Sequence, residues 1–434
     1  MAGGTWKRQD KKRAGAYIDV VSNGSNLQTA SIVGVVTIPL AINFGPENKV
    51  VTLTNDMTLT EFGYTTDDEQ MLLVREALKR ASKVLAFRVG TGEKATKTEG
   101  TLTITAKYTG SRGNDITVVS KAMVDVADTF NVQTFLGGTL VDTQSVTKYD
   151  DLVENEFVTF SGSGTAQAFT TKLANGSDTQ AQIADYKKYF EAIRLYDFNT
   201  MALAVTDSTI KSAAASFINR LREDEGDKRQ LVVAKHTVDD EAVINVKNGV
   251  VLSDGTKITP EQATAWVAGA SAAAGIDKSL TYDSYDGAVD VTERYLNSEI
   301  EAALDNGEFI FVEKRGKVIV EQDINSLHTF SAEKDKSFSK NRVLRVLDDI
   351  ANNTKRAFED YFIGKVDNNV DGRELFKANR ITYLNELQVA GAIQNFKADD
   401  VVVEPGIEKD SIIMNFNVQP VDALEKLYLK VVVQ

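Results

Sequence analysis

Residues 200–234 read TMALAVTDSTIKSAAASFINRLREDEGDKRQLVVA, and this stretch decides the fold class. An apolar run at 200–205 and a second one at 230–234 have the length and composition of buried strands. Between them, 207–223 has the length of a helix, and another helix is predicted just upstream at 180–193. Strands that alternate with helices are typical of a parallel sheet covered by helices. The sequence therefore predicts an α/β domain.

The alternation of strands and helices continues on both sides of this stretch. Upstream, we expect strands at 32–38 and 84–89 around a helix at 66–82, which would make one parallel strand–helix–strand unit. Downstream, we expect helices at 260–274 and 290–306, the first with Thr259 as N-cap and Pro260 in its first turn. A hairpin at 308–313 and 317–322 follows, turning at Arg315 and Gly316. We assign 29–90 and 179–322 to one central α/β domain.

Residues 91–178 follow a different pattern. Segments of alternating apolar and polar residues at 101–107, 115–120, 129–136 and 156–161 are separated by Gly, Asn, Asp and Ser. Such alternation, with few helical repeats, is typical of short antiparallel strands. We therefore expect a small all-β domain, of sandwich or barrel type, inserted into the central domain.

The last hundred residues form a third pattern, of mixed helices and strands. A long amphipathic helix is predicted at 338–366 and a second helix at 371–393, followed by strands at 400–403, 411–418 and 427–433. We assign 323–434 to a C-terminal α+β domain. Its last strand is so apolar that it must pair with another strand or become an aggregation hazard.

Residues 1–28 are expected to form an arm. One short strand-like run, 16–21, lies between glycines and a polar turn and has too few apolar residues to build a core. Such a run could add to the edge of a sheet in another molecule. The alternative is a terminal tail without a role.

The composition excludes several classes of function. The chain has no cysteine, which removes disulfides and thiolate chemistry and fits folding in a reducing cytoplasm. It has only two histidines, His236 and His328, so a metal site rich in histidine is out of reach. The net charge of −13 argues against a general affinity for nucleic acid. No apolar run approaches the roughly 18–20 residues that cross a bilayer, and the polar N-terminus is not a secretory signal.

Two loop motifs resemble binding sites but have the wrong spacing. The Gly-containing stretch 90–96 lacks the Gly-Lys-Ser/Thr of a phosphate loop and leads into the β domain, so we interpret it as a flexible domain boundary. The stretch 367–372 resembles the start of a calcium loop, but Ala378 occupies the position of the bidentate Glu, and Asp371 is better explained as a helix N-cap. His236 has no nucleophile elbow near it, and His328 is expected in a strand as a packed or partly exposed residue. We therefore expect no enzyme, no cofactor and no metal site.

Several strings of residues resemble the tail sheath proteins of contractile bacteriophages and prophages. At the N-terminus these are Ala2-Gly-Gly-Thr-Trp6 and Ala14-Gly-Ala-Tyr-Ile18. The others, in chain order, are Ala106-Lys-Tyr-Thr-Gly110-Ser-Arg-Gly-Asn114, Thr259-Pro-Glu-Gln through Ala268-Gly-Ala with Lys278-Ser-Leu-Thr281, Asp323-Ile-Asn-Ser-Leu327, Val418-Gln-Pro-Val-Asp-Ala423 and Glu425-Lys-Leu-Tyr428.

This resemblance implies a mechanical function and a set of partners. It implies a central domain of subtilisin-like α/β topology without protease activity, and polymerisation in stacked sixfold rings around an inner tube protein. The sheath would meet baseplate and tail terminator proteins, assemble in the bacterial cytoplasm and end in a phage tail or a released tail-like particle. It also implies strand exchange between neighbouring copies of the chain. The residues of the two expected exchange strands are Tyr17, Ile18, Val20 and Val21, and Leu427, Tyr428, Leu429, Val431, Val432 and Val433.

The resemblance further implies that a helix of the C-terminal domain contacts the tube. The predicted helix 338–366 carries the basic residues Lys340, Arg342, Arg345, Lys355 and Arg356, which would suit an acidic tube surface. The alternative is that these are solvated helix residues. Two other functions also stay open: another phage tail, baseplate or capsid protein, and a hydrolase-like enzyme with a degenerate motif.

Overall fold

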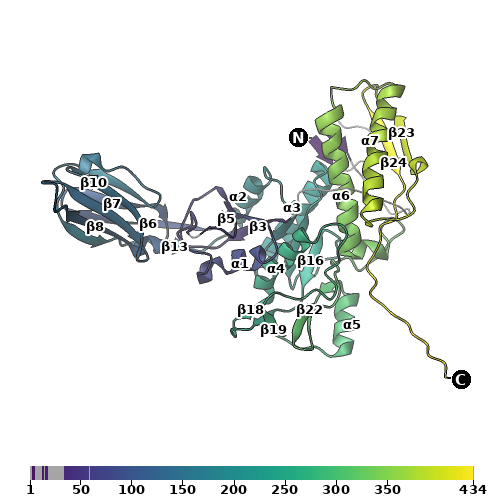
Figure 1. Cartoon of the computed structure of the whole chain (residues 1–434), viewed down its shortest axis with the longest axis horizontal. Coiled ribbons are helices and arrows are strands. Elements are labelled where there is room, and N and C mark those ends of the chain that lie inside the picture. The colour runs from purple at the N-terminus through teal and green to yellow at the C-terminus, as the bar shows by residue number, and fades with distance from the viewer. Residues whose placement is uncertain (1, 5–11, 14, 18–33, 58, 434) are drawn as a thin grey trace. The chain divides into compact units, whose positions relative to one another are not determined.

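The computed structural model describes residues 2–4, 12–13, 15–17, 34–57 and 59–433. By their internal contacts these residues form two compact units. Unit 1 holds the described N-terminal residues up to 36 together with 76–83 and 197–433, and unit 2 holds 37–75 and 84–196. Figure 1 shows the chain with its helices and strands labelled.

Unit 1 is built on four parallel strands in the order β14 (Thr200–Ala202), β15 (Gln230–Ala234), β16 (Val243–Val246) and β20 (Glu308–Phe309). Every residue of the first three strands is buried, as expected for parallel strands covered on both faces. Helices α3 (Ser208–Arg220) and α4 (Pro260–Ala273) pack against β15. The predicted α/β alternation is confirmed here, although the sequence pattern missed β16.

The two helices of this core begin at side-chain caps. The Asp207 carboxylate accepts hydrogen bonds from the backbone N–H groups of Thr209 and Ile210 at the start of α3. The Thr259 hydroxyl accepts from the N–H of Gln262, whose side chain returns to the N–H of Thr259, so that α4 begins with a capping box. The predicted N-cap and start of α4 are confirmed.

A group of short elements follows α4 in unit 1. Strands β17 (Val250–Leu252), β18 (Lys257–Ile258) and β19 (Ala288–Val291) form an antiparallel sheet, and β21 (Phe311–Lys314) pairs with β22 (Lys317–Val320) as predicted. Arg315 and Gly316 both have positive φ, as a two-residue hairpin turn requires. The helix predicted at 290–306 is wrong in its first part, because β19 pairs with β17 there and helix α5 spans only Asn297–Asp305.

The C-terminal part of unit 1 consists of two helices and a hairpin (Figure 1). Helix α6 (Asn341–Ala357) continues as a π-helical turn (Phe358–Phe362), and α7 (Val370–Val389) follows. Strands β23 (Val401–Pro405) and β24 (Ile412–Phe416) pair with each other, and a core that includes Ile350, Leu387 and Val401 lies between helices and hairpin. The cap of α7 is Asn369 and not Asp371, because the Asn369 side chain accepts the N–H of Gly372.

Unit 2 contains most of three neighbouring strands in the order β3 (Val35–Leu40), β5 (Lys83–Arg88) and β4 (Val50–Leu53), with β4 antiparallel to β5. The helix expected at 66–82 is shorter than predicted, since only Leu72–Leu78 (α1) is α-helical after a 3-10 turn at Glu69–Met71. Helix α2 (Ile183–Ile193) places the fully buried Tyr189 hydroxyl 2.8 Å from that of Thr37 in β3.

The rest of unit 2 is a β-sandwich, which confirms the predicted all-β domain. Its two four-stranded sheets have the orders β10-β9-β8-β12 and β11-β7-β6-β13, and a core that includes Ile104, Val118 and Phe157 lies between them. Residues 90–96 lie at the entry of this domain as predicted, but they are not a flexible linker, because β6 begins at Thr91, which pairs with Thr179 at the exit of the domain. The strands are β6 (Thr91–Glu99), β7 (Leu102–Thr109), β8 (Ile116–Ala122), β9 (Phe130–Leu136), β10 (Thr139–Val146), β11 (Val158–Gly162), β12 (Phe169–Lys172) and β13 (Ser177–Thr179).

Gly269 in α4 offers a test of the packing in unit 1. A Cβ at this position would lie 2.4 Å from the backbone carbonyl oxygen of Ala77, which cannot move as a side chain could. In an open helix position, Gly→Ala stabilises by about 1 kcal/mol. We expect Gly269→Ala instead to destabilise the protein by about 1–3 kcal/mol, measured by thermal unfolding followed by circular dichroism. A rise in the unfolding temperature would contradict this close approach.

Candidate functional site: helix α6 and the chain termini

One face of helix α6 carries a row of polar side chains. Asn341, Arg345, Asp348, Asn352 and Lys355 follow one another at intervals of four and three residues, so they lie along a single face. None of the residues 341–357 is exposed. We call these five residues the polar row; each of them contacts a segment of unit 1 that lies outside the C-terminal helices and hairpin.

The first half of the polar row contacts the loops around Asp323. The amide of Asn341 donates to Asp323 Oδ1 at 2.9 Å and accepts from the Gln230 side chain at 3.1 Å. Arg345 donates to Asp323 Oδ2 at 2.8 Å and to the carbonyl oxygen of Lys278 at 2.7 Å. The fully buried Asp323 carboxylate thus accepts hydrogen bonds from both the Asn341 amide and the Arg345 guanidinium.

The second half of the polar row contacts the segment after α3. Arg222 donates from both terminal nitrogens to Asp348, at 2.7 and 2.8 Å, in a bidentate pair. Asn352 exchanges two hydrogen bonds with the backbone of Lys228, at 2.8 and 3.0 Å. Lys355 donates to Asp227 Oδ1 at 2.6 Å and to the carbonyl oxygen of Glu225 at 2.7 Å.

The Arg222 guanidinium is buried, and its ion pair with Asp348 affects its pKa. Burial has the largest single effect and by itself would lower the pKa of the Arg222 guanidinium, but the charge and hydrogen bonds of Asp348, together with the nearby charges of Glu241 and Asp240, outweigh burial and raise that pKa. The two side chains are only 5% and 12% exposed, so little water screens the pair. Removing one partner of such a pair leaves a buried charge and destabilises a protein by about 3–5 kcal/mol.

The other face of α6 holds helix α7. Asn353 accepts a hydrogen bond from Arg380 at 2.9 Å, and the buried hydroxyl of Tyr383 donates to the carbonyl oxygen of Asp349 at 3.2 Å. Helix α6 is therefore embedded between two sets of partners.

The structure gives most of the predicted tube-contact residues internal partners. Lys340 pairs with Glu425, Arg345 with Asp323, and Lys355 with Asp227. Arg342 and Arg356 are half-buried. Three of the five basic side chains expected at the tube, those of Lys340, Arg345 and Lys355, thus form ion pairs within the chain.

The C-terminal tail is the most exposed apolar segment of the described chain. Its apolar residues after position 426 are between 70% and 91% exposed. Within the residues that the structure describes, the tail pairs with no strand, so the strand predicted at 427–433 is not formed in this single chain. Figure 1 shows the tail running away from the C-terminal helices. The residues concerned are Leu427, Tyr428, Leu429, Val431, Val432 and Val433.

The N-terminal exchange strand is only partly described. Strand β1 (Ala2–Gly4) pairs in parallel with β2 (Gly15–Tyr17), and β2 contacts α6 and the π-helical turn after it. Tyr17 thus ends β2, whereas Ile18, Val20 and Val21 lie outside the described residues.

The hairpin of β23 and β24 has two unpaired edges in the described chain. Its strands pair only with each other, while Val403, Met414 and Phe416 pack on the helices beneath. An edge with free N–H and C=O groups is a template for an added strand. The structure therefore holds both an unpaired apolar strand segment and an unpaired sheet edge.

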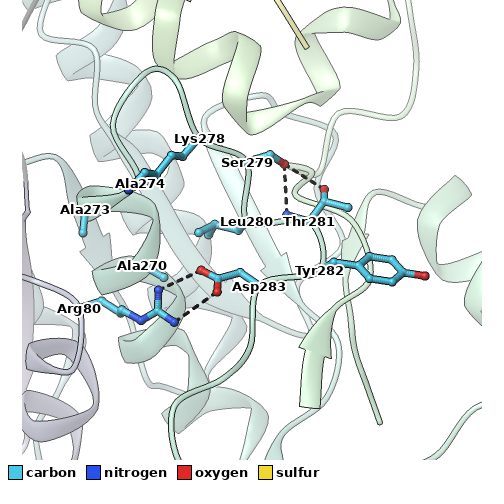
Figure 2. Close-up of a pocket in the computed structure, with 10 residues that line it drawn as sticks. All are labelled: Arg80, Ala270, Ala273, Ala274, Lys278, Ser279, Leu280, Thr281, Tyr282 and Asp283. Atoms are coloured by element: carbon cyan, nitrogen blue, oxygen red, sulfur yellow. Dashed lines mark hydrogen bonds and ion pairs between the residues drawn. The ribbon is translucent and has the colours of Figure 1, made fainter. Parts of the chain in front are cut away.

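A surface hollow of about 490 Å³ lies beside the loop 278–283. Figure 2 shows the Arg80 guanidinium pointing at the Asp283 carboxylate across its wall, and the Ser279 and Thr281 hydroxyls bonded to each other. Arg80 also donates to Asp286. These polar groups satisfy one another, and none of them is a nucleophile with an adjacent base.

The two histidines lie in loops without a catalytic arrangement. Burial lowers the pKa of His236, which follows β15. His328 is not in a strand, contrary to prediction, and its Nδ1 lies 2.8 Å from the carbonyl oxygen of Ser326. In the described part of the chain, no three His, Asp or Glu side chains gather as metal ligands, and no helix is long and apolar enough to cross a membrane.

These features define a multidomain α/β protein with an inserted β-sandwich, whose candidate site lies at a chain terminus and not in a cavity. Family models of phage tail sheath proteins match almost all of it. They are the domain III N-terminal region of the tail sheath protein Gp18 at 34–89, the sheath β-sandwich domain at 90–181, the sheath central domain at 179–326 and the sheath C-terminal domain at 333–434.

Whole-length relatives agree with these family models. The chain is 37% identical over 464 residues to phage-like element PBSX protein XkdK of Bacillus subtilis strain 168, with 99% of both chains covered. A solved sheath tail protein from Desulfitobacterium hafniense is 43% identical, with a TM-score of 0.85 over 96% of this chain and 99% of that one. The chain belongs to the phage tail sheath protein family, a family of structural proteins and not of enzymes.

The fold is shared more widely. The helical sheath of the anti-feeding prophage, solved in its contracted state, has a TM-score of 0.56 at 14% identity, over 99% of both chains. At this identity the likeness concerns the fold alone.

The polar row was not predicted from the sequence, although the spacing of its residues is visible there. Polar residues recur every seven positions at 341, 348 and 355 and again at 345 and 352 in the predicted helix. A row of this kind predicts a buried polar contact as readily as a solvated face. Their partners are up to 130 residues away, as between Lys355 and Glu225, and only the structure identifies them.

The polar row predicts a specific stability defect. Arg222→Met leaves the Asp348 carboxylate buried without its partner and should destabilise the protein by about 3–5 kcal/mol, measured by urea denaturation. The double variant Arg222→Met with Asp348→Leu removes both charges and should recover most of this loss. Arg294→Met breaks the exposed pair with Asp290 and serves as the control, with a change below about 1 kcal/mol. A single Arg222 variant as stable as the Arg294 control would contradict the structural role of the row.

Proposed function

We propose that this chain is the sheath subunit of a contractile tail, which polymerises as stacked sixfold rings around an inner tube and contracts to drive the tube through a cell envelope. The exposed apolar tail at 427–433 carries the proposal, together with membership of the sheath family. In this assembly the central α/β domain has a subtilisin-like topology and acts as a scaffold. The central domain consists of residues 29–90 and 179–322, with the inserted β domain at 91–178. The C-terminal domain is 323–434, and residues 1–28 form an N-terminal arm.

Strand exchange between copies accounts for both unpaired features of the C-terminal domain. The tail of one copy adds to the edge of β23 or β24 in another copy, so that main-chain hydrogen bonds link the two. Such a link tolerates rotation of the linked bodies. Strand β2 lies against α6 and the turn after it, which favours a corresponding role for Tyr17, Ile18, Val20 and Val21.

The energetics explain why the tail is free in a single copy. Burial of an apolar side chain contributes roughly 1.5–3 kcal/mol, and the tail has six of them. Fixing the backbone costs about 1–2 kcal/mol per residue, a sum of similar size. Pairing therefore becomes favourable only where a preformed edge supplies hydrogen bonds as well. The hairpin of another copy is such an edge.

The remaining partners follow from the same role. The inner tube protein, the baseplate and the tail terminator contact the polymer, while nucleic acid and membrane do not. Assembly takes place in the bacterial cytoplasm, which suits a chain without cysteine. Tube contact stays a proposal for the five basic residues Lys340, Arg342, Arg345, Lys355 and Arg356. Of these, Arg342 and Arg356 are the two that form no ion pair with a carboxylate of the described residues. Charge reversal at both positions should weaken tube decoration in electron micrographs of extended tails, and unchanged decoration would contradict it.

Proline substitution tests the strand-exchange link at single-residue resolution. Leu429→Pro and Val431→Pro remove one N–H each and break a strand ladder, whereas Leu429→Ala and Val431→Ala keep the backbone. We expect at least one proline variant, and deletion of 426–434, to leave a folded monomer that no longer forms tubes. The alanine controls should still form them, as judged by negative-stain electron microscopy and sedimentation. Tubes of normal length from the deletion variant would refute strand exchange by this tail.

A further inference from the structure

The root of the C-terminal tail is held by this chain itself. The backbone N–H of Val421 donates to the carbonyl oxygen of Ala392 at 2.9 Å. From Val421 to Glu425 the residues alternate between half-buried and exposed, as in an extended chain lying on a surface. From Lys426 onward every described residue is exposed. Glu425 is therefore the last residue of the tail that lies against the body of its own copy.

At the end of this segment, the Glu425 carboxylate lies between two polar side chains, those of Thr281 and Lys340. Its Oε1 accepts a hydrogen bond from the Thr281 hydroxyl at 2.7 Å, and its Oε2 receives Lys340 Nζ at 2.5 Å. The side chains of Glu425 and Lys340 are only 11% and 15% exposed. An ion pair this sheltered from water is screened much less by salt than a surface pair.

The groups around Glu425 are themselves held in place. Thr281 Oγ1 accepts the backbone N–H of Asp323 at 2.9 Å, and the Asp323 carboxylate receives Arg345 of the polar row. Lys340 immediately precedes Asn341, the first residue of α6. The site for Glu425 is thus built from the same loops that hold helix α6.

We propose that Glu425, clipped between Lys340 and Thr281, is the positioning residue that fixes where the C-terminal arm leaves the subunit. This inference rests on the proposed strand exchange. It specifies the residue at which the exchanging arm leaves its own subunit. If the clip opens while the Val421 hydrogen bond holds, residues 422–425 are freed. Four extended residues lengthen the arm by up to about 14 Å. The clip therefore sets the reach and direction of the arm.

The clip can be tested in the dilute full-length protein, independently of assembly. Because the chain has no cysteine, Lys257→Cys on the exposed side of β18 and Tyr428→Cys in the arm take two spin labels without further changes. Double electron–electron resonance then measures the distribution of distances between body and arm. We expect Glu425→Gln and Lys340→Met to broaden this distribution and shift it to longer distances. The charge-swapped pair Lys340→Glu with Glu425→Lys should restore the parent distribution.

Asp422→Asn is the matched control for this experiment. Asp422 lies three residues before Glu425 and is exposed, and its carboxylate accepts only the N–H of the adjacent Ala423. This variant removes the same charge from the same segment and should leave the distance distribution unchanged. A distribution as narrow in Glu425→Gln as in the parent, or a charge-swapped pair that stays broad, would overturn the clip.

The consequence for assembly separates this inference from the proposed function. We expect Glu425→Gln to raise the protein concentration needed for half-maximal polymer, with Asp422→Asn at the parent value. If deletion of 426–434 abolishes polymer but Glu425→Gln assembles like the control, the clip is wrong and strand exchange stands. If the deletion variant still polymerises, strand exchange itself is wrong.

Discussion

The contacts of helix α6 with the rest of unit 1 constrain everything that lies beyond residue 340. Five polar side chains on one face of the helix meet buried carboxylates, backbone amides and a guanidinium, and the Arg222–Asp348 pair lies among them. Apolar packing tolerates small slides, whereas a bidentate ion pair and paired amides accept only one register. The C-terminal helices and hairpin are thereby fixed to the strands of unit 1 in a defined orientation.

This fixed orientation matters for the polymerisation that we propose. A sheath link made by a short arm has a defined geometry only if the arm starts from a rigid point and ends at a rigid edge. The polar row holds helix α6, whose Val346 and Ile350 share a core with the β23–β24 hairpin, and through Asp323 and Lys340 it also borders the root of the arm. Starting point and proposed end point of the link thus depend on the same buried polar contacts. The described residues of unit 1 contain no comparably long exposed apolar segment besides this tail.

Local signals in the sequence predicted much of the fold. Thr259 and Pro260 located the start of α4, the apolar run at 230–234 is β15, and alternation revealed the β-sandwich. The predictions that failed concern segments whose local sequence pattern favours one structure while pairing with a distant strand imposes another. Residues 288–291 form a strand because β17 is available to pair with them, and 91–96 form part of a strand for the same reason, with β13 and β7 as partners. The ion pairs of Arg345 and Lys355 were not predicted, because a basic residue in a sequence does not reveal its partner and Asp323 and Asp227 lie far away in the chain. The apolar terminus was recognised as unpaired because nothing in its own neighbourhood could cover it.

The central claim is that the tail of one subunit completes the sheet of another. The most direct measurement is an electron cryomicroscopy map of the polymer formed by the purified full-length chain, at a resolution that traces the backbone. The account predicts residues 427–433 as a β-strand hydrogen-bonded to the free edge of β23 or β24 in a different copy. A polymer in which this segment stays unpaired, or pairs only within its own copy, would contradict the account.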